Sequence, residues 1–122
     1  MESWKLTWTK LVAFNATNVD AIKSALPGVY RISYKADDDN YYVFYVGQAE
    51  DIKQRLHEHL LPSETNICIR NRVEKGNCAF RYAEITKDYI RNAAEQQMFK
   101  HYQPSCNEKE PSGRDDVTVN LT

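Results

Sequence analysis

The densest runs of β-branched and aromatic residues lie in two segments that follow each other closely in the first half of the chain. One segment runs from Val29 to Tyr34 and the other from Tyr41 to Val46. Such residues fit a pleated, half-buried surface and are typical of β-strands. Between the two segments, residues 36–40 read Ala-Asp-Asp-Asp-Asn, a cluster of turn formers. The pattern therefore predicts a β-hairpin.

The register of this hairpin decides which side chains meet across it. With the turn centred in the acidic run, Tyr34 is expected to lie opposite Tyr41, and Tyr30 opposite Tyr45. Directly opposed residues have Cβ atoms roughly 5 Å apart. Two phenols from distant positions are therefore expected to meet on one face of a small sheet.

A helical pattern follows the hairpin. Gly47 is expected to end the second strand, and a helix is expected to begin at about Glu50. Ile52, Leu56 and Leu60 are spaced i, i+4 and i+8, which places them on one buried face of this helix.

Two charged or titratable residues of the same helix lie beside this apolar face. Arg55 and His59 are i, i+4 neighbours. Their helical positions put them at the border of the buried stripe and not in open water. An arginine beside a core stripe normally meets an anion or a carboxylate there.

The N-terminal part is expected to form an extension that packs on the core. Residues 4–12 alternate as a half-buried strand does, with Trp4 and Trp8 on the apolar side. A short helix capped by Thr17 or Asn18 is expected to follow and to stop at residues 27 and 28, Pro-Gly. Its inner face is expected to comprise Val19, Ile22 and Leu26.

The C-terminal part is expected to contain two more helices and a strand. The first helix begins at Ser63 or Thr65 and runs to about residue 75, a strand covers residues 77–85, and the last helix runs from residue 86 or 87 to about 102. Glu95 falls on the half-buried shoulder of the last helix. Alternation at residues 117–121 predicts an edge strand beside the N-terminal one.

Composition supports one folded domain of the α/β or α+β class. The chain has 122 residues, of which 42% are hydrophobic, and no apolar run approaches the ~18 residues of a membrane span. The start of the chain has no apolar signal core, so a cytoplasmic protein that does not contact a membrane is expected. The three cysteines, at 68, 78 and 106, show no Cys-x-x-Cys spacing, and their odd number predicts reduced thiols.

The formal net charge of −1 argues against a uniformly basic nucleic-acid surface. Non-specific DNA affinity depends on Lys and Arg residues that displace counterions, so any such surface must be a local patch. Candidate DNA contacts are Lys53, Arg70 and Arg72, and a solvated mixed-charge surface is the alternative.

Five elements in order resemble the GIY-YIG nuclease superfamily. They are Gly28-Val29-Tyr30, Tyr45-Val46-Gly47, Arg55 on the next helix, Glu95 on a later helix, and Asn107 shortly after it. The resemblance covers about residues 26–107. The interval between the two triplets, residues 31–44, is longer than is usual in this family.

The resemblance implies a three-stranded antiparallel sheet flanked by helices, α+β overall. The stand-alone catalytic domain would span residues 1–122, with its core at about 26–107, an N-terminal extension at 1–25 and a tail at 108–122. It implies a metal-dependent DNA endonuclease that uses Mg²⁺, for which Mn²⁺ may substitute. A separate targeting subunit or a homodimer would then supply DNA targeting, because no additional DNA-binding domain is expected in this chain.

Each motif residue has an implied role. Glu95 would bind the metal, and Arg55 would clamp the scissile phosphate through its planar donors. Tyr30 would activate the attacking water and Tyr45 would position it. Because a phenol ordinarily titrates near pH ~10, a direct base role for Tyr30 requires a lowered pKa or a metal-bound water nearby.

The remaining implied roles are supportive. His59 would accept a proton or bind phosphate, and Asn107 would orient the site or hold its loop. Gly28 and Gly47 would serve backbone geometry and close approach.

Structural roles are the alternatives for all of these residues. Glu95 would then be a helix-surface glutamate, and Arg55 would form an ion pair with Glu58 or Asp51. The tyrosines would be core residues of the sheet, and His59 a satisfied half-buried histidine. On that basis the competing function is a catalytically inactive nucleic-acid-binding or protein-interaction module. An RNA-directed nuclease is a further alternative.

Overall fold

The computed structural model describes residues 2–122, and its central feature is a four-stranded antiparallel sheet in the order β2-β5-β3-β4. A second, two-stranded parallel sheet joins β1 to β6. The elements in chain order are β1 (Glu2–Trp4), β2 (Val12–Ala13), α1 (Ala16–Asp20), β3 (Gly28–Lys35), β4 (Tyr41–Ala49), α2 (Ile52–Leu60), α3 (Ile67–Lys75), β5 (Cys78–Glu84), α4 (Asp88–Tyr102) and β6 (Val117–Val119).

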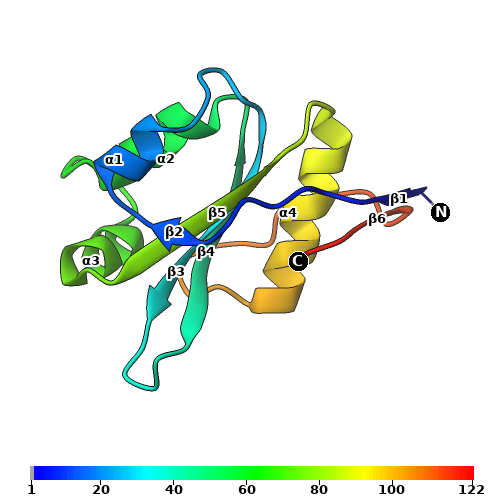
Figure 1. Cartoon of the computed structure of the whole chain (residues 1–122). Coiled ribbons are helices and arrows are strands. Elements are labelled where there is room, and N and C mark those ends of the chain that lie inside the picture. Colours follow the sequence, from blue (N-terminus) through cyan, green and yellow to red (C-terminus); the bar gives the residue numbers. More distant parts are fainter. Residues whose placement is uncertain (1) are drawn as a thin grey trace.

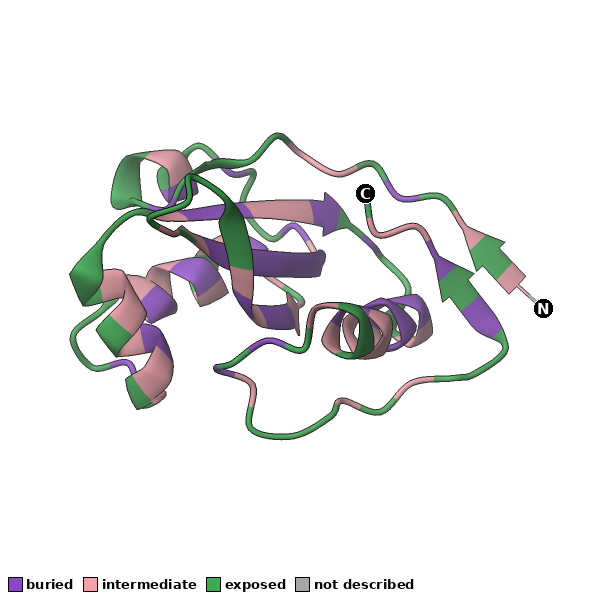
Figure 2. Ribbon diagram, turned by 90° about the horizontal axis from the view of Figure 1, so that it is seen from below, coloured by how far each residue is buried: buried purple, intermediate pink, exposed green. Residues whose placement is uncertain are grey.

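Helices cover both faces of the sheet (Figure 1). The helices α1, α2 and α3 pack on one face, where the core includes Phe44, Ile52, Leu56 and Phe80. On the other face α4 packs together with β6. Figure 2 shows the buried positions gathered in the sheet and on the inner faces of the helices, while the segment between α4 and β6 is largely exposed. None of the helices in residues 2–122 is long and apolar enough to cross a bilayer.

The sheet confirms the predicted hairpin and helices but has four strands where three were expected. The extra strand is β2, which pairs with the outer edge of β5. The predicted strand over residues 4–12 was wrong as a continuous element. The span contains only the last residue of β1, an isolated bridge between Trp8 and Ala83, and the first residue of β2.

The predicted hairpin register was also wrong. Tyr34 lies opposite Tyr42 and not Tyr41, so the register already differs by one residue next to the turn. A bulge between Ile32 and Ser33 shifts it by one more residue, which places Tyr30 opposite Gly47 and Tyr45 opposite Ile32. A bulge adds one residue to one strand, so a register counted outward from the turn cannot anticipate it. In addition, β4 continues through Gly47 to Ala49 and does not end at the glycine.

Several predicted element boundaries shift by a few residues. Helix α1 ends at Asp20, well before the Pro-Gly pair, and Asn15 caps its first turn. Asn66, and neither Ser63 nor Thr65, caps α3. The predicted inner face of the N-terminal segment is nevertheless buried, because that segment still packs its apolar residues against α2 and the sheet.

The predicted C-terminal edge strand is present and lies beside the N-terminal strand. Glu2, Ser3 and Trp4 pair in parallel with residues 117–119. The side chains of Val117 and Val119 are buried against α4.

The expectation of reduced cysteines is contradicted for two of the three. Cys68 in α3 and Cys106 after α4 form a disulfide, while Cys78 is free. The two bonded cysteines are 38 residues apart in sequence. Their pairing results from the tertiary approach of α3 to the loop after α4, which no local spacing of cysteines encodes.

Candidate active site

A polar cleft of about 620 Å³ lies along the outer edge of β4. This edge is where residues from both faces of the sheet approach each other, because β4 is the last strand of the sheet on this side. The cleft is lined by Tyr45, Arg55, Glu64, Thr65, Asn66, Glu95 and Asn107, and by residues 108–112. Four of the six residues expected to be catalytic therefore share one cavity: Tyr45, Arg55, Glu95 and Asn107.

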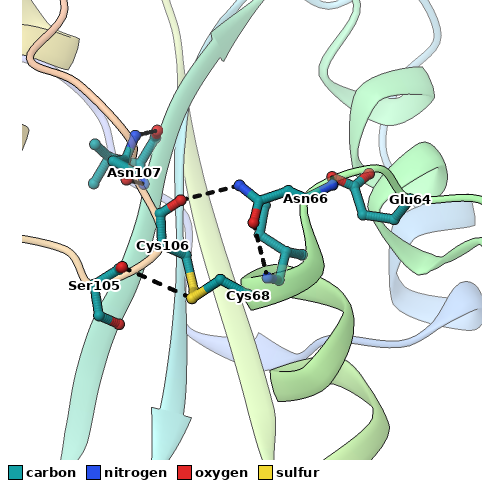
Figure 3. Close-up of a disulfide and its surroundings, with 8 residues drawn as sticks. Glu64, Asn66, Cys68, Ser105, Cys106 and Asn107 are labelled. Carbon is teal, nitrogen blue, oxygen red and sulfur yellow. Dashed lines mark hydrogen bonds between the residues drawn. A yellow bond between two sulfur atoms is a disulfide. The ribbon is translucent and has the colours of Figure 1, made fainter.

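Asn107 closes the free edge of β4 with its side-chain amide. Its Oδ1 accepts from the backbone N–H of Val46 at 3.0 Å, and its Nδ2 donates to the carbonyl of Val46 at 2.9 Å. The amide thus substitutes for a neighbouring strand, which satisfies backbone groups that an edge strand leaves unpaired. Figure 3 shows this contact directly after the disulfide, so the loop that carries Asn107 is tethered to α3.

The two glycines permit contacts that a side chain would block. A Cβ at Gly47 would lie 2.6 Å from the Tyr30 Oη, and one at Gly28 would lie 2.1 Å from the carbonyl oxygen of Ala83. The close approach at Gly47 is made by the ring of Tyr30, which lies directly across the hairpin. Gly47 therefore makes room for the tyrosine of the first motif.

The two motif tyrosines meet although they are not directly opposed. Their ring centroids are 6.2 Å apart, as diagonal neighbours across β3 and β4. His59 of α2 packs against both rings, and its Nε2 lies 2.8 Å from the Tyr30 hydroxyl. Tyr30 is only 1% exposed, so Tyr45 is the phenol that borders the cleft.

Both phenols are held in the neutral form. Burial raises the pKa of Tyr30 well above its ordinary value, and the neighbouring Tyr45 adds to this rise. Burial also raises the pKa of Tyr45, although the guanidinium of Arg55 opposes the increase. The lowered pKa that would make Tyr30 a base by itself is therefore not present in this arrangement.

Burial lowers the pKa of the His59 imidazole, whereas it raises the pKa of the two phenols. Desolvation, with a further contribution from the positive charge of Arg55, lowers the pKa of His59 to about 4. His59 is consequently neutral at pH 7 and accepts a hydrogen bond through one ring nitrogen.

Arg55 contributes its positive charge to the cleft while also forming an ion pair. Its Nη1 lies 3.0 Å from Glu58 Oε1, one turn along α2. Both side chains are more than one-third exposed, so this pair contributes little to stability. The ion pair anticipated as an alternative role thus coexists with a position on the cleft wall.

Glu95 projects from α4 toward the end of β4. Gln48 Nε2 donates to Glu95 Oε1 at 3.0 Å and also to Oδ1 of Asn92. Burial raises the pKa of Glu95, and the hydrogen bonds from Gln48 oppose this rise. A cation near this carboxylate would favour its charged form.

The donor set fits a hard divalent cation that retains most of its water. Four glutamates are among the residues that line the cleft, and Mg²⁺ is commonly held by one or two carboxylates plus water and substrate phosphate. Within residues 2–122, no cluster of three or more His, Cys, Asp or Glu side chains is arranged to enclose a metal ion. A metal ion held by Glu95 would therefore take most of its ligands from water and substrate.

The candidate DNA contacts are outside the cleft. Neither Lys53 nor Arg70 lines it, and Arg72 lies over the ring of Tyr34 toward the hairpin tip, with its Cζ 3.8 Å from the ring centroid. The structure does not bring these three cations together with the motif residues.

Sequence reasoning missed Glu64, which is 6% exposed and contacts His59. Glu64 lies in the irregular segment between α2 and α3, where the sequence predicted only that a helix begins at Ser63 or Thr65. No periodic pattern identifies a buried carboxylate in such a segment. Gln48 was missed as well, since nothing in the second motif triplet points to the residue that follows it.

Comparison with known proteins adds one result. The family model of the GIY-YIG catalytic domain matches residues 26–110. No curated protein sequence matches the chain. The matched segment begins just before β3, contains the first and second motif triplets, and ends after the loop of Asn107.

Proposed function

Because this chain belongs to the GIY-YIG catalytic domain family, a family of endonucleases, we propose that it hydrolyses DNA phosphodiester bonds in a metal-dependent reaction. The observation that supports this proposal best is the convergence of Tyr45, Arg55, Glu95 and Asn107 on one polar cleft. These side chains come from β4, α2, α4 and the following loop, so simple packing of one element does not explain their meeting.

The proposed role of Arg55 is to bind the scissile phosphate. Its guanidinium presents several donors in a plane, which suits the oxygens of a phosphodiester. The charge that develops on these oxygens in the transition state is stabilised by donors already in place. Tyr45 borders the same cleft as a neutral phenol, so its hydroxyl can orient the phosphate or the attacking water.

Glu95 is the proposed ligand of the metal, and Mg²⁺ is the proposed ion, with Mn²⁺ as a substitute. Bound divalent metal supplies Lewis-acid stabilisation of the leaving oxygen and lowers the pKa of a bound water. Gln48 holds one oxygen of Glu95 by a hydrogen bond and thereby fixes the direction of the carboxylate.

Asn107 is proposed to act through β4. By pairing with both backbone groups of Val46, it fixes the strand segment between Tyr45 and Gly47. Tyr45 is then presented to the cleft, and Gln48 to Glu95, from a rigid edge. This role agrees with the expectation that Asn107 orients the site.

DNA is the proposed partner, and a homodimer or a separate subunit is proposed to provide targeting. The net charge of −1 offers little general attraction to a polyanion, so the isolated domain is expected to bind DNA weakly. Lys53, Arg70 and Arg72 remain proposed secondary contacts with the flanking backbone. The proposed location is the cytoplasm. The disulfide argues against this location, because thiols are mostly kept reduced in the cytoplasm.

A cleavage assay tests the proposed function. Wild-type protein and Glu95→Ala would be incubated with branched, nicked and linear DNA, with Mg²⁺, with Mn²⁺ and with a chelator, and a single-stranded RNA would serve as the alternative substrate. We expect metal-dependent cleavage of DNA by the wild type and none by the variant. Equal inactivity of both proteins on every substrate would favour an interaction module instead, and cleavage of RNA alone would favour an RNA nuclease.

A further inference from the structure

The side chain of Glu64 is buried at the wall of the candidate cleft, and each of its two oxygens faces a nitrogen of a neighbouring residue. It is 5% exposed, and one of its oxygens, Oε2, lies 3.3 Å from His59 Nδ1. Its other oxygen, Oε1, lies 3.3 Å from the backbone nitrogen of Asn66, which donates to it. Figure 3 shows Glu64 and Asn66 in the segment that leads into the helix of Cys68, with Asn66 between Glu64 and the disulfide. A carboxylate buried in this way is normally kept by specific partners.

His59 lies between this carboxylate and the tyrosine of the first motif. Its side chain has no exposed surface, its Nε2 lies 2.8 Å from the Tyr30 hydroxyl, and its Nδ1 faces Glu64. Within residues 2–122, Nδ1 has no aligned hydrogen-bond partner, and the carboxylate of Glu64 is the acceptor that faces it. A neutral imidazole carries its proton on one nitrogen only, and the acceptor beside one nitrogen selects the tautomer.

We propose that Glu64 is a positioning residue that holds His59 in the tautomer protonated at Nδ1 and thereby directs the hydroxyl proton of Tyr30 toward His59 Nε2. This proposal rests on the proposed nuclease function, and it gives Tyr30 the water-activating role that the family resemblance implies. A phenol has a single proton to donate. Once that proton points to Nε2, the Tyr30 oxygen can only accept from any other group, which is the orientation needed to receive a hydrogen bond from water.

The arrangement also explains how Tyr30 can assist a water molecule although its phenol is not ionised. Because Tyr30 is neutral, its usefulness in water activation depends on which way its O–H points. The opposite tautomer, with the proton on Nε2, would make His59 the donor to Tyr30. The phenol proton would then point away from His59, and the Tyr30 oxygen would no longer be limited to accepting a hydrogen bond from water.

The substitution Glu64→Gln keeps the size and shape of the side chain but removes its charge and one of its two acceptor oxygens. A carboxylate has two acceptor oxygens for two donors, whereas an amide has one oxygen and one NH₂ group. If the amide oxygen serves the N–H of Asn66, its NH₂ group faces Nδ1 and selects the other tautomer of His59. The matched control is Glu84→Gln, which makes the same chemical change at an exposed position of β5.

Imidazole ¹⁵N chemical shifts in the two-bond ¹H–¹⁵N spectrum test the proposal directly, with the signals of His59 assigned by comparison with His59→Gln. At pH 7 we expect Nδ1 to be protonated and Nε2 to be bare in the wild type and in Glu84→Gln. We expect the opposite state in Glu64→Gln. Protonation at Nε2 in the wild type would overturn the proposal, whatever the activity of the protein.

The kinetic prediction is that Glu64→Gln lowers kcat by roughly 10- to 100-fold, the usual effect of losing the partner that orients a functional histidine. KM for a DNA substrate should change little, because Glu64 makes no proposed contact with phosphate. An unchanged kcat together with a reversed tautomer would also overturn the proposal. A wild type that cleaves no substrate would refute the nuclease function, while the ¹⁵N spectrum would still decide the tautomer.

Discussion

Two pairs of tyrosines lie along the β3–β4 hairpin, yet only one pair is part of the candidate site. Tyr30 and Tyr45 lie near the base of the hairpin, with ring centroids 6.2 Å apart. Tyr34 and Tyr42 lie near its tip, with centroids 5.8 Å apart. The two pairs consist of the same residue type in nearly the same geometry.

Each pair also has an arginine from a helix beside it. Arg55 of α2 lines the cleft together with Tyr45, and Arg72 of α3 stacks on the ring of Tyr34. Residue types alone therefore do not distinguish the two regions. A list of aromatic and cationic residues would assign both to nucleic-acid binding with equal justification.

The environments of the two pairs differ in burial and in their polar partners. Tyr30 is 1% exposed and contacts His59, whereas Tyr42 is 44% exposed and donates to the carboxylate of Asp38 in its own turn. Only the base of the hairpin meets the carboxylate of Glu95, because α4 crosses the sheet there. The comparison teaches that the crossing of helices over a strand edge, and not the tyrosines themselves, creates the site.

The largest expected effect comes from removing each arginine in turn. Arg55→Ala should lower kcat roughly 100- to 1000-fold, the usual cost of losing one preorganised donor to a developing charge. Arg72→Ala should leave kcat within about threefold and weaken DNA binding slightly. The slope of the logarithm of the binding constant against the logarithm of salt concentration should become smaller in magnitude by about one. Single-turnover cleavage and binding titrations at several salt concentrations measure both. Equal losses of turnover and affinity for Arg55→Ala would make it a simple affinity contact.

Reducing the disulfide should affect the base of the hairpin more than its tip. The bond between Cys68 and Cys106 closes a long loop, so its loss is expected to lower the free energy of unfolding by about 3 kcal/mol. Denaturant unfolding with and without a phosphine reductant measures this change. The double variant Cys68→Ala/Cys106→Ala should be insensitive to the reductant, and Cys78→Ala should respond as the wild type does.

Hydrogen exchange locates the effect of that reduction. The amide of Val46 donates to Asn107, which directly follows the disulfide, whereas the amide of Lys35 donates to Asn77 near the hairpin tip. We expect reduction to accelerate exchange at Val46 and to leave Lys35 nearly unchanged. Equal acceleration at both amides would mean that the disulfide stabilises the domain as a whole.

Acid should destabilise the base of the hairpin through His59. Burial lowers its pKa to about 4 from an ordinary value of 6.5, so the unfolded chain binds a proton more readily than the fold does. Stability is therefore fully present above pH 6.5 and is lost as the pH falls toward 4, by about 3 kcal/mol.

The contribution of His59 appears as a difference between variants, because carboxylates titrate in the same range. His59→Gln should be less stable than the wild type at pH 7 but should lose less stability between pH 6.5 and 4. His101→Gln, which alters an exposed histidine, should follow the wild-type curve. Parallel curves for the wild type and His59→Gln would contradict the buried neutral state.

The smallest expected effect comes from deleting single phenol oxygens. Tyr30→Phe leaves Nε2 of His59 without its partner in a buried site and should cost about 1–2 kcal/mol in stability. Tyr34→Phe should change stability by less than about 0.5 kcal/mol, since its position is partly exposed. Thermal or denaturant unfolding of both variants measures the two changes in stability. Equal losses of stability in Tyr30→Phe and Tyr34→Phe would contradict the expected difference between the two pairs.

The sequence was sufficient for the hairpin, the three helices that follow it and the order of the motif residues, because these depend on periodicity and local signals. It was not sufficient for the hairpin register, which differs by one residue at the turn and by a second at the bulge, so that Tyr30 lies opposite Gly47. It also gave no indication of β2, whose two residues pair only because the tertiary fold brings them to β5.

In the candidate site, too, the sequence identified some residues and missed others. Arg55, Glu95 and Asn107 were identified through ordered motifs and do line one cleft. Glu64 was not, because its importance depends on burial against His59, which is a contact between an irregular segment and a helix. The disulfide was missed for the same reason, since only the fold brings Cys68 and Cys106 together.

The most direct test of a single shared cleft is a double-mutant cycle with Arg55→Ala and Glu95→Gln, in single-turnover DNA cleavage with Mg²⁺. Residues that act on the same phosphate as a unit have non-additive effects, so the double variant should be about as slow as the slower single variant. Losses that multiply would mean that Arg55 and Glu95 act independently, and would contradict one shared active site.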